Sequence, residues 1–166
     1  MDDAARNASA KTSASNLYDE DFYAWTQEQA GLLRQGRVAQ ADLANILEEI
    51  ETLGRKEVSE LRSRYKVLLQ HLLKDIYQPD RSGRSWKTTI LNQRIEIARH
   101  IGDNPSLKAR ADGIFLEAYG DARKLAASET GIDIGVFPDV PPFTQEQALD
   151  QEWELGRDPV PPSESA

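Results

Sequence analysis

Cysteine is absent from this chain of 166 residues. Its absence excludes a disulfide framework, a thiolate nucleophile and any zinc site built on cysteine. Only two histidines are present, and neither belongs to a Glu-x-x-His or His-Glu-x-x-His pattern. A glycine-rich phosphate loop and a Ser/His/Asp signature are also missing. We therefore expect no metal and no cofactor.

Long apolar runs are missing as well. No segment approaches the ~20 consecutive apolar residues that span a bilayer. Residues 1–15 contain acidic side chains and no apolar core, so they are not predicted to be a secretory signal. These absences predict a soluble, cytoplasmic protein with no membrane partner.

The net charge of −8 is distributed unevenly. Residues 1–60 carry −6, residues 61–127 carry +6 and residues 128–166 carry −8. A basic middle between acidic ends predicts that segments attract one another, within one chain or between chains. The overall sign disfavours nucleic acid, whose phosphates would be repelled, so binding through the basic middle is only a third option.

The most prominent feature present is one apolar stripe between Leu43 and Ile76. Its members recur at three- and four-residue steps, the period of a helix with one buried face. They are Leu43, Ile46, Leu47, Ile50, Leu53, Val58, Leu61, Tyr65, Leu68, Leu72 and Ile76. The stripe predicts a helix from about residue 39 to about residue 78, ended by Pro79, with an apolar part roughly 50 Å long. Gly54 inside it costs ~1 kcal/mol relative to alanine, so either a neighbour approaches closely there or the helix bends.

Shorter helices are predicted on both sides of this long one. One covers about 16–36, ending at Gly36, and another covers about 84–101. A further helix begins at Asn104, with Pro105 in its first turn, and ends before Gly131.

The C-terminal part reads as a strap over these helices. Residues 132–143 are predicted to be extended, and Thr144 with Gln147 forms a capping box for a short helix to about Trp153. The expected fold is all-α: an antiparallel bundle of about four main helices with one long central helix and an irregular C-terminal strap. It forms a single domain, 16–155, between a disordered tail at 1–15 and a loose tail at 156–166.

Several short segments match a known family in order and spacing. They are 17–19, 21–25, 46–51, 53–55, 71–74, 85–86, 89–90, 93–94, 105–107, 118–119, 122–123 and 137–138. Over residues 17 to about 155 the chain resembles a bacterial family catalogued as domain of unknown function 29. The resemblance implies an all-helical fold and implies no activity. Two positions depart from the family pattern: Asp75, where an aromatic residue is frequent, and Pro141, where a cysteine is frequent.

Arg94 is the most suggestive polar residue. At 100° per residue it shares one helix face with Trp86, Ile90, Ile97 and Ile101. A guanidinium in an apolar stripe needs a carboxylate partner, since an unpaired buried charge is very costly. The alternatives are a structural ion pair, an arginine that snorkels outward, or an anion-binding arginine.

A polar ridge on the long helix could supply that partner. Glu57 lies within the stripe, and Arg64 and His71 follow at seven-residue steps. If Arg94 meets this ridge, the cluster could perform acid–base chemistry through His71, with Glu57 and Arg94 beside it. The structural alternative is a polar seam that sets the register of the helices.

Other charged groups suggest surface contacts more than chemistry. Glu48, Glu49 and Glu51 project in three directions from one helix, so ion pairs with Arg55 and Lys56 are expected instead of a metal site.

On the next helix, Glu96 and His100 are expected to form a solvent-exposed pair. The basic set Arg81, Arg84, Lys87 and Arg99, with Trp86 nearby, is expected to face the acidic tail or an acidic partner.

Two function hypotheses from different classes result. The first is a non-enzymatic protein-interaction or self-associating helical module, expected to be a homodimer because an overhanging long helix exposes apolar surface. The second is a small-molecule or hydrolytic site in the bundle core that uses Glu57, His71 and Arg94. The sequence therefore leaves open whether the protein is an enzyme.

Overall fold

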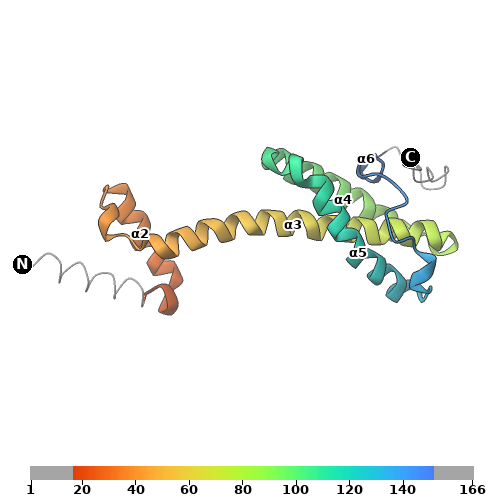
Figure 1. The fold of residues 1–166 in the computed structure, drawn as a ribbon, viewed down its shortest axis with the longest axis horizontal. Helices are drawn as coiled ribbons and strands as arrows, with labels where there is room; N and C mark the ends of the chain where they lie inside the picture. Colours follow the sequence, from red (N-terminus) through yellow and green to blue (C-terminus); the bar gives the residue numbers. More distant parts are fainter. Residues whose placement is uncertain (1–16, 152–166) are drawn as a thin grey trace, which may run out of the picture. The chain divides into compact units, whose positions relative to one another are not determined.

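A computed structural model describes residues 17–151 of the protein (Figure 1). All regular structure within this range is helical, with one long helix, which confirms the all-α prediction. None of these helices combines the length and apolar character needed to cross a membrane. The predicted tails lie outside the described residues. The last helix ends at Leu149 and not, as predicted, near Trp153, because Asp150 is extended. The chain divides into two compact units, the first ending at Arg55 and the second beginning at Lys56.

The first unit contains α2 (Phe22–Arg34), the short 3-10 helix η1 (Val38–Gln40) and the first turns of α3 (Leu43–Tyr77). The Asp21 carboxylate accepts a hydrogen bond from the Ala24 amide at 3.0 Å and so begins α2. Trp25 is buried, with ring centroids 4.9 Å from Tyr18 and 5.5 Å from Phe22. The Tyr18 hydroxyl donates to Glu49 at 2.6 Å, which ties this aromatic cluster to α3.

The long helix begins later than the predicted residue 39. Gly36 adopts a left-handed φ of +69° after α2, which confirms it as a stop signal. The chain then makes the tight turn of η1, and the buried Gln29 side chain accepts a hydrogen bond from the Asp42 amide at 2.8 Å. The Asp42 carboxylate in turn accepts from the Asn45 side chain at 2.7 Å. These contacts hold residues 38–42 outside the helix, so α3 starts at Leu43.

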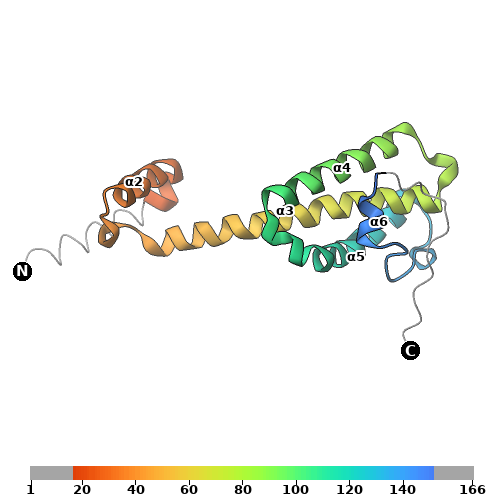
Figure 2. The same ribbon diagram turned by 90° about the horizontal axis from the view of Figure 1, so that it is seen from above.

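The second unit packs the rest of α3 against α4 (Arg84–Asp103) and α5 (Ala111–Thr130) (Figure 2). Lys74 lies over Trp86 at one end of the α3–α4 pair, and Glu57 contacts His100 at the other, so these helices are antiparallel. The short helices η2 (Pro79–Arg81) and η3 (Pro105–Arg110) make the connections.

The core of this unit is built on α3. Five of its leucines and Tyr65 are fully buried, and the Tyr65 ring meets Phe115 of α5 edge-on at 5.6 Å. The leucines are Leu61, Leu68, Leu69, Leu72 and Leu73. Because α4, α5 and the C-terminal strap all contact this stretch, it is covered on more than one face, beyond the single stripe of the sequence pattern.

The helix that follows α4 begins differently from the prediction. Residues 105–110 form η3, and α5 begins only at Ala111. The Asn104 side chain does not cap a helix, because its amide donates to the Glu57 carboxylate at 3.2 Å and to the His100 carbonyl at 3.1 Å. The predicted stop is confirmed: Gly131 follows α5 with a left-handed φ of +73°.

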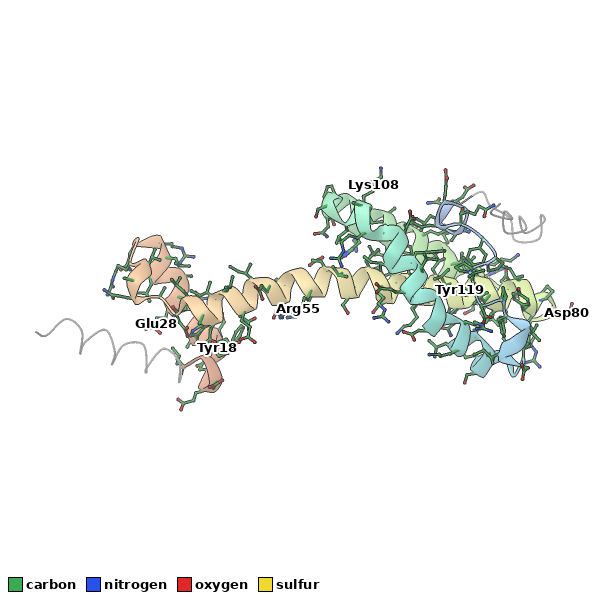
Figure 3. The ribbon with its side chains drawn as sticks, in the orientation of Figure 1. Tyr18, Glu28, Arg55, Asp80, Lys108 and Tyr119 are labelled. Carbon is green, nitrogen blue, oxygen red and sulfur yellow. The ribbon has the colours of Figure 1, made fainter. Side chains whose placement is uncertain are left out.

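The strap closes the second unit. It contains η4 (Ile134–Val136), a fully buried Phe137 and α6 (Gln145–Leu149). The Tyr119 hydroxyl, labelled in Figure 3, donates to the Pro138 carbonyl at 2.8 Å. The predicted capping box of Thr144 and Gln147 is present and begins α6.

Candidate functional site

Arg94 is buried, with 6% of its surface exposed, and it contacts the strap. Its Nε donates to the Ala148 carbonyl oxygen of α6 at 2.9 Å. Its Nη2 has no hydrogen-bond partner within the described residues. Burial lowers the pKa of the Arg94 guanidinium, and the Asp150 carboxylate acts in the opposite direction.

The prediction that Arg94 pairs with a carboxylate of the long helix is therefore wrong. The last carbonyls of a helix have no partner within it, and α6 presents one of them to α4. Arg94 satisfies the Ala148 carbonyl and so fastens the strap.

Glu57 contacts the end of α4. The His100 Nε2 lies 2.9 Å from the Glu57 carbonyl oxygen and 3.5 Å from its carboxylate. The side chain of His100 is only 13% exposed, so the expectation of a solvent-exposed Glu96–His100 pair is wrong. The face of α4 that carries His100 turns toward α3, where the imidazole contacts Glu57.

Arg64 and His71 have partners of their own. Arg64 Nη2 lies 2.7 Å from Glu60 on the same helix and 3.5 Å from Glu96 of α4. His71 Nδ1 lies 2.9 Å from the Val67 carbonyl, one turn back along α3. None of these contacts joins Glu57, His71 or Arg94 to another member of the predicted cluster.

A buried lysine that sequence reasoning missed lies at the end of α3. Lys74 is 6% exposed, and its Nζ lies 2.6 Å from a Glu129 carboxylate oxygen of α5 and 4.4 Å from the centre of the Trp86 ring. The hydrogen bond from Lys74 lowers the pKa of Glu129. Helix periodicity did not predict this contact, because Lys74 falls outside the apolar stripe and its contacts come from two other helices, α4 and α5. Its ammonium is engaged by this ion pair and this ring contact, the pattern of a structural lysine.

A shallow depression of about 430 Å³ lies beside the start of α4. It is lined by Ser82, Gly83, Arg84, Lys87, Thr88 and Leu91. Within residues 17–151, Arg81, Arg84 and Lys87 form no ion pair, whereas Arg99 pairs with Glu96 at 2.5 Å. The lining offers positive charge but no carboxylate or imidazole for acid–base catalysis.

The first unit leaves an apolar helix face uncovered. Leu43, Leu47, Ile50 and Leu53 of α3, here called the 43–53 face, are between 51% and 60% exposed. Gly54 follows directly, and a Cβ added there would meet no atom within 4 Å. Arg55, labelled in Figure 3, forms the expected ion pair with Glu51 at 3.6 Å.

The acidic group on this part of α3 does not converge. Glu49 accepts from Tyr18, while Glu51 faces Arg55. In the described part of the chain, no three histidine, aspartate or glutamate side chains gather closely enough to hold a metal ion.

These contacts define an all-helical protein whose buried polar groups hold helices and a strap together, and whose most unusual surface is an uncovered helix face. The chain belongs to the family described as domain of unknown function DUF29, which matches residues 17–154. This match confirms the family resemblance. No curated protein and no solved structure matches the chain.

Proposed function

We propose that this protein is a non-enzymatic helical interaction module of the bacterial cytoplasm, which binds another protein chain through the 43–53 face. One observation carries the proposal. The apolar stripe of α3 is fully buried at Leu61, Leu68 and Leu72, yet it is more than half exposed at Leu47 and Ile50. A contiguous exposed apolar patch on a helix is typical of a protein-binding surface.

The size of the face suggests a moderate affinity. Fully burying a leucine or isoleucine side chain contributes about 1.5–3 kcal/mol. Since about half of each of the four side chains remains to be buried, covering the face contributes roughly 3–6 kcal/mol before the costs of association. This free energy counts the side chains of one partner only. It favours association, but it is too small by itself to hold a permanent complex.

The small-molecule or hydrolytic alternative has no comparable support. Glu57, His71 and Arg94 each contact a different element or a backbone carbonyl. Since no contact assembles them around one space, we do not propose a reaction for them.

Site-specific photo-crosslinking in cells tests the proposal. A photoreactive residue is placed at Leu47, which is 59% exposed, or at the control position Leu116 of α5, which is 58% exposed. We expect a protein adduct from position 47 and none from position 116. Equal adduct yields at the two positions would refute binding through the 43–53 face.

A further inference from the structure

We infer that the 43–53 face binds one amphipathic helix of a different protein, and that this helix carries lysine or arginine beside its apolar residues. The inference rests on the proposed function and deepens it by stating the chemistry of the partner. The spacing of the exposed side chains supports a helix as the partner, and the charges around them support a basic one.

The width and the length of the 43–53 face match a single helix. At 100° per residue, its four side chains fall within a sector of about 120°. The face begins at the first residue of α3 and ends before Gly54, which adds no side chain to it, so it is about 15 Å long. Two helices pack along such a stripe through residues spaced three and four apart. A partner helix of about three turns therefore covers the face.

The charged side chains around the face are mainly acidic. Between residues 42 and 55 the chain has one base, Arg55, and four acids. The acids are Asp42, Glu48, Glu49 and Glu51. The described part of the first unit, residues 17–55, has eight acidic and three basic side chains and therefore a net charge of −5. Such a surface attracts a partner of opposite charge and repels one of like charge.

Two of these carboxylates are available to a partner. Glu48 and Glu51 lie along one edge of the face, within about 100° of Leu47 around the helix. Within the described residues Glu48 is exposed and forms no ion pair. Glu51 pairs with Arg55 at 3.6 Å, but both side chains remain more than half exposed, and exposed pairs of this kind are weak. Basic side chains of the partner therefore meet Glu48 and Glu51.

A second copy of this chain fits the face less well. In a two-fold contact both chains use the same surface. The first unit, with its net charge of −5, would then lie against its own duplicate. The repulsion between the two units opposes pairing through this face, so the partner helix belongs to a different protein.

Titration with two synthetic peptides tests the chemistry of the partner. Both peptides are about four helical turns long and share one stripe of leucines, but they carry either lysine or glutamate beside that stripe. Fluorescence anisotropy of the dye-labelled peptide measures its binding to the full chain. We expect the lysine peptide to bind at least about tenfold more tightly, and higher ionic strength to reduce the difference. Equal affinities, or no binding of either peptide, would refute the inference.

Charge reversal locates the contact. Glu48→Lys combined with Glu51→Lys should reverse the preference, so that the glutamate peptide binds more tightly. The matched control, Glu20→Lys combined with Glu28→Lys, changes the net charge equally at exposed positions outside α3 and should keep the preference for lysine (Figure 3 labels Glu28). A reversal in the control as well would show that only net charge matters, which contradicts the contact.

The apolar part of the contact has its own variant. Leu47→Gln removes an apolar side chain without adding charge, and it should weaken the binding of both peptides about tenfold. Circular dichroism checks that each variant folds. Unchanged binding of both peptides to a folded Leu47→Gln protein would refute docking on the 43–53 face.

The segment that crosslinks to position 47 in cells separates this inference from the proposed function. Mass spectrometry of the digested adduct identifies that segment. We expect apolar residues at helical spacing, with lysines or arginines beside them. An acidic or uncharged segment, or a segment of a second copy of this chain, would refute the basic partner and retain the interaction surface. Equal adduct yields at positions 47 and 116 would refute both.

Discussion

Residues 43–55 and 61–75 belong to the same helix and carry the same apolar period, yet only the second stretch is covered. In the second stretch even Gln70, Lys74 and Asp75 are buried, because α4, α5 and the strap surround the helix. In the first stretch the leucines stand half exposed. The difference shows that periodicity determines which face of a helix is apolar, while other elements determine whether that face is buried.

The largest difference between the stretches is expected in stability. Leu72→Ala removes a fully buried side chain and should lower the free energy of unfolding by about 2–5 kcal/mol. Leu47→Ala removes a half-exposed one and should change the stability of the monomer by about 0.5 kcal/mol or less. Urea denaturation at low protein concentration measures both. Equal losses would mean that the 43–53 face is covered within its own chain.

The packing around the second stretch can be weakened at the hydrogen bond between Arg94 and the strap. Arg94→Met leaves the Ala148 carbonyl without its donor, and we expect a loss of about 1–3 kcal/mol in stability. Hydrogen exchange should quicken in α6. Arg99→Met, at an exposed position of the same helix, is the control and should have little effect. A stabilised Arg94→Met protein would show instead that the buried charge outweighs the hydrogen bond.

Two glycines of the second unit should respond in opposite directions. Gly131→Ala forces a side chain into a left-handed conformation and should cost about 1 kcal/mol. Gly113→Ala, inside α5 where a Cβ has open space, should gain about 0.5–1 kcal/mol. Thermal unfolding compares the two.

The smallest effect concerns pH. The hydrogen bond from Lys74 holds the pKa of Glu129 below its ordinary value of 4.5, so the charged form stabilises the fold. This contribution is complete above that value and is lost as the pH falls through the lowered pKa. Wild type should therefore lose more stability than Glu129→Gln between pH 5 and pH 3. Identical pH profiles would show that the contact contributes nothing measurable.

Local signals in the sequence predicted much of the fold. The stripe, Gly36, Gly131 and the Thr144–Gln147 box act within a turn or two of the chain, and the structure bears them out. The late start of α3 escaped prediction, because it depends on Gln29, thirteen residues before the Asp42 amide that it binds.

The candidate site was less predictable for the same reason. The partners of Arg94 and of His100 lie 54 and 43 residues away in the sequence. Helix periodicity places a side chain on a face but does not state which element packs there. Lys74 is the clearest example of this limit of helix periodicity, since its burial results from α4 and α5 together.

The contact between Lys74 and Trp86 also makes the protein its own optical probe. Of three tryptophans, Trp25 is buried among aromatic rings in the first unit, and Trp86 lies under an ammonium group in the second. Indole emission responds to nearby charge and to water, so each ring should report its own surroundings by wavelength and quenching. Replacing Trp153 and one of these two by phenylalanine would leave a single indole, whose fluorescence would follow the unfolding of one unit without a dye.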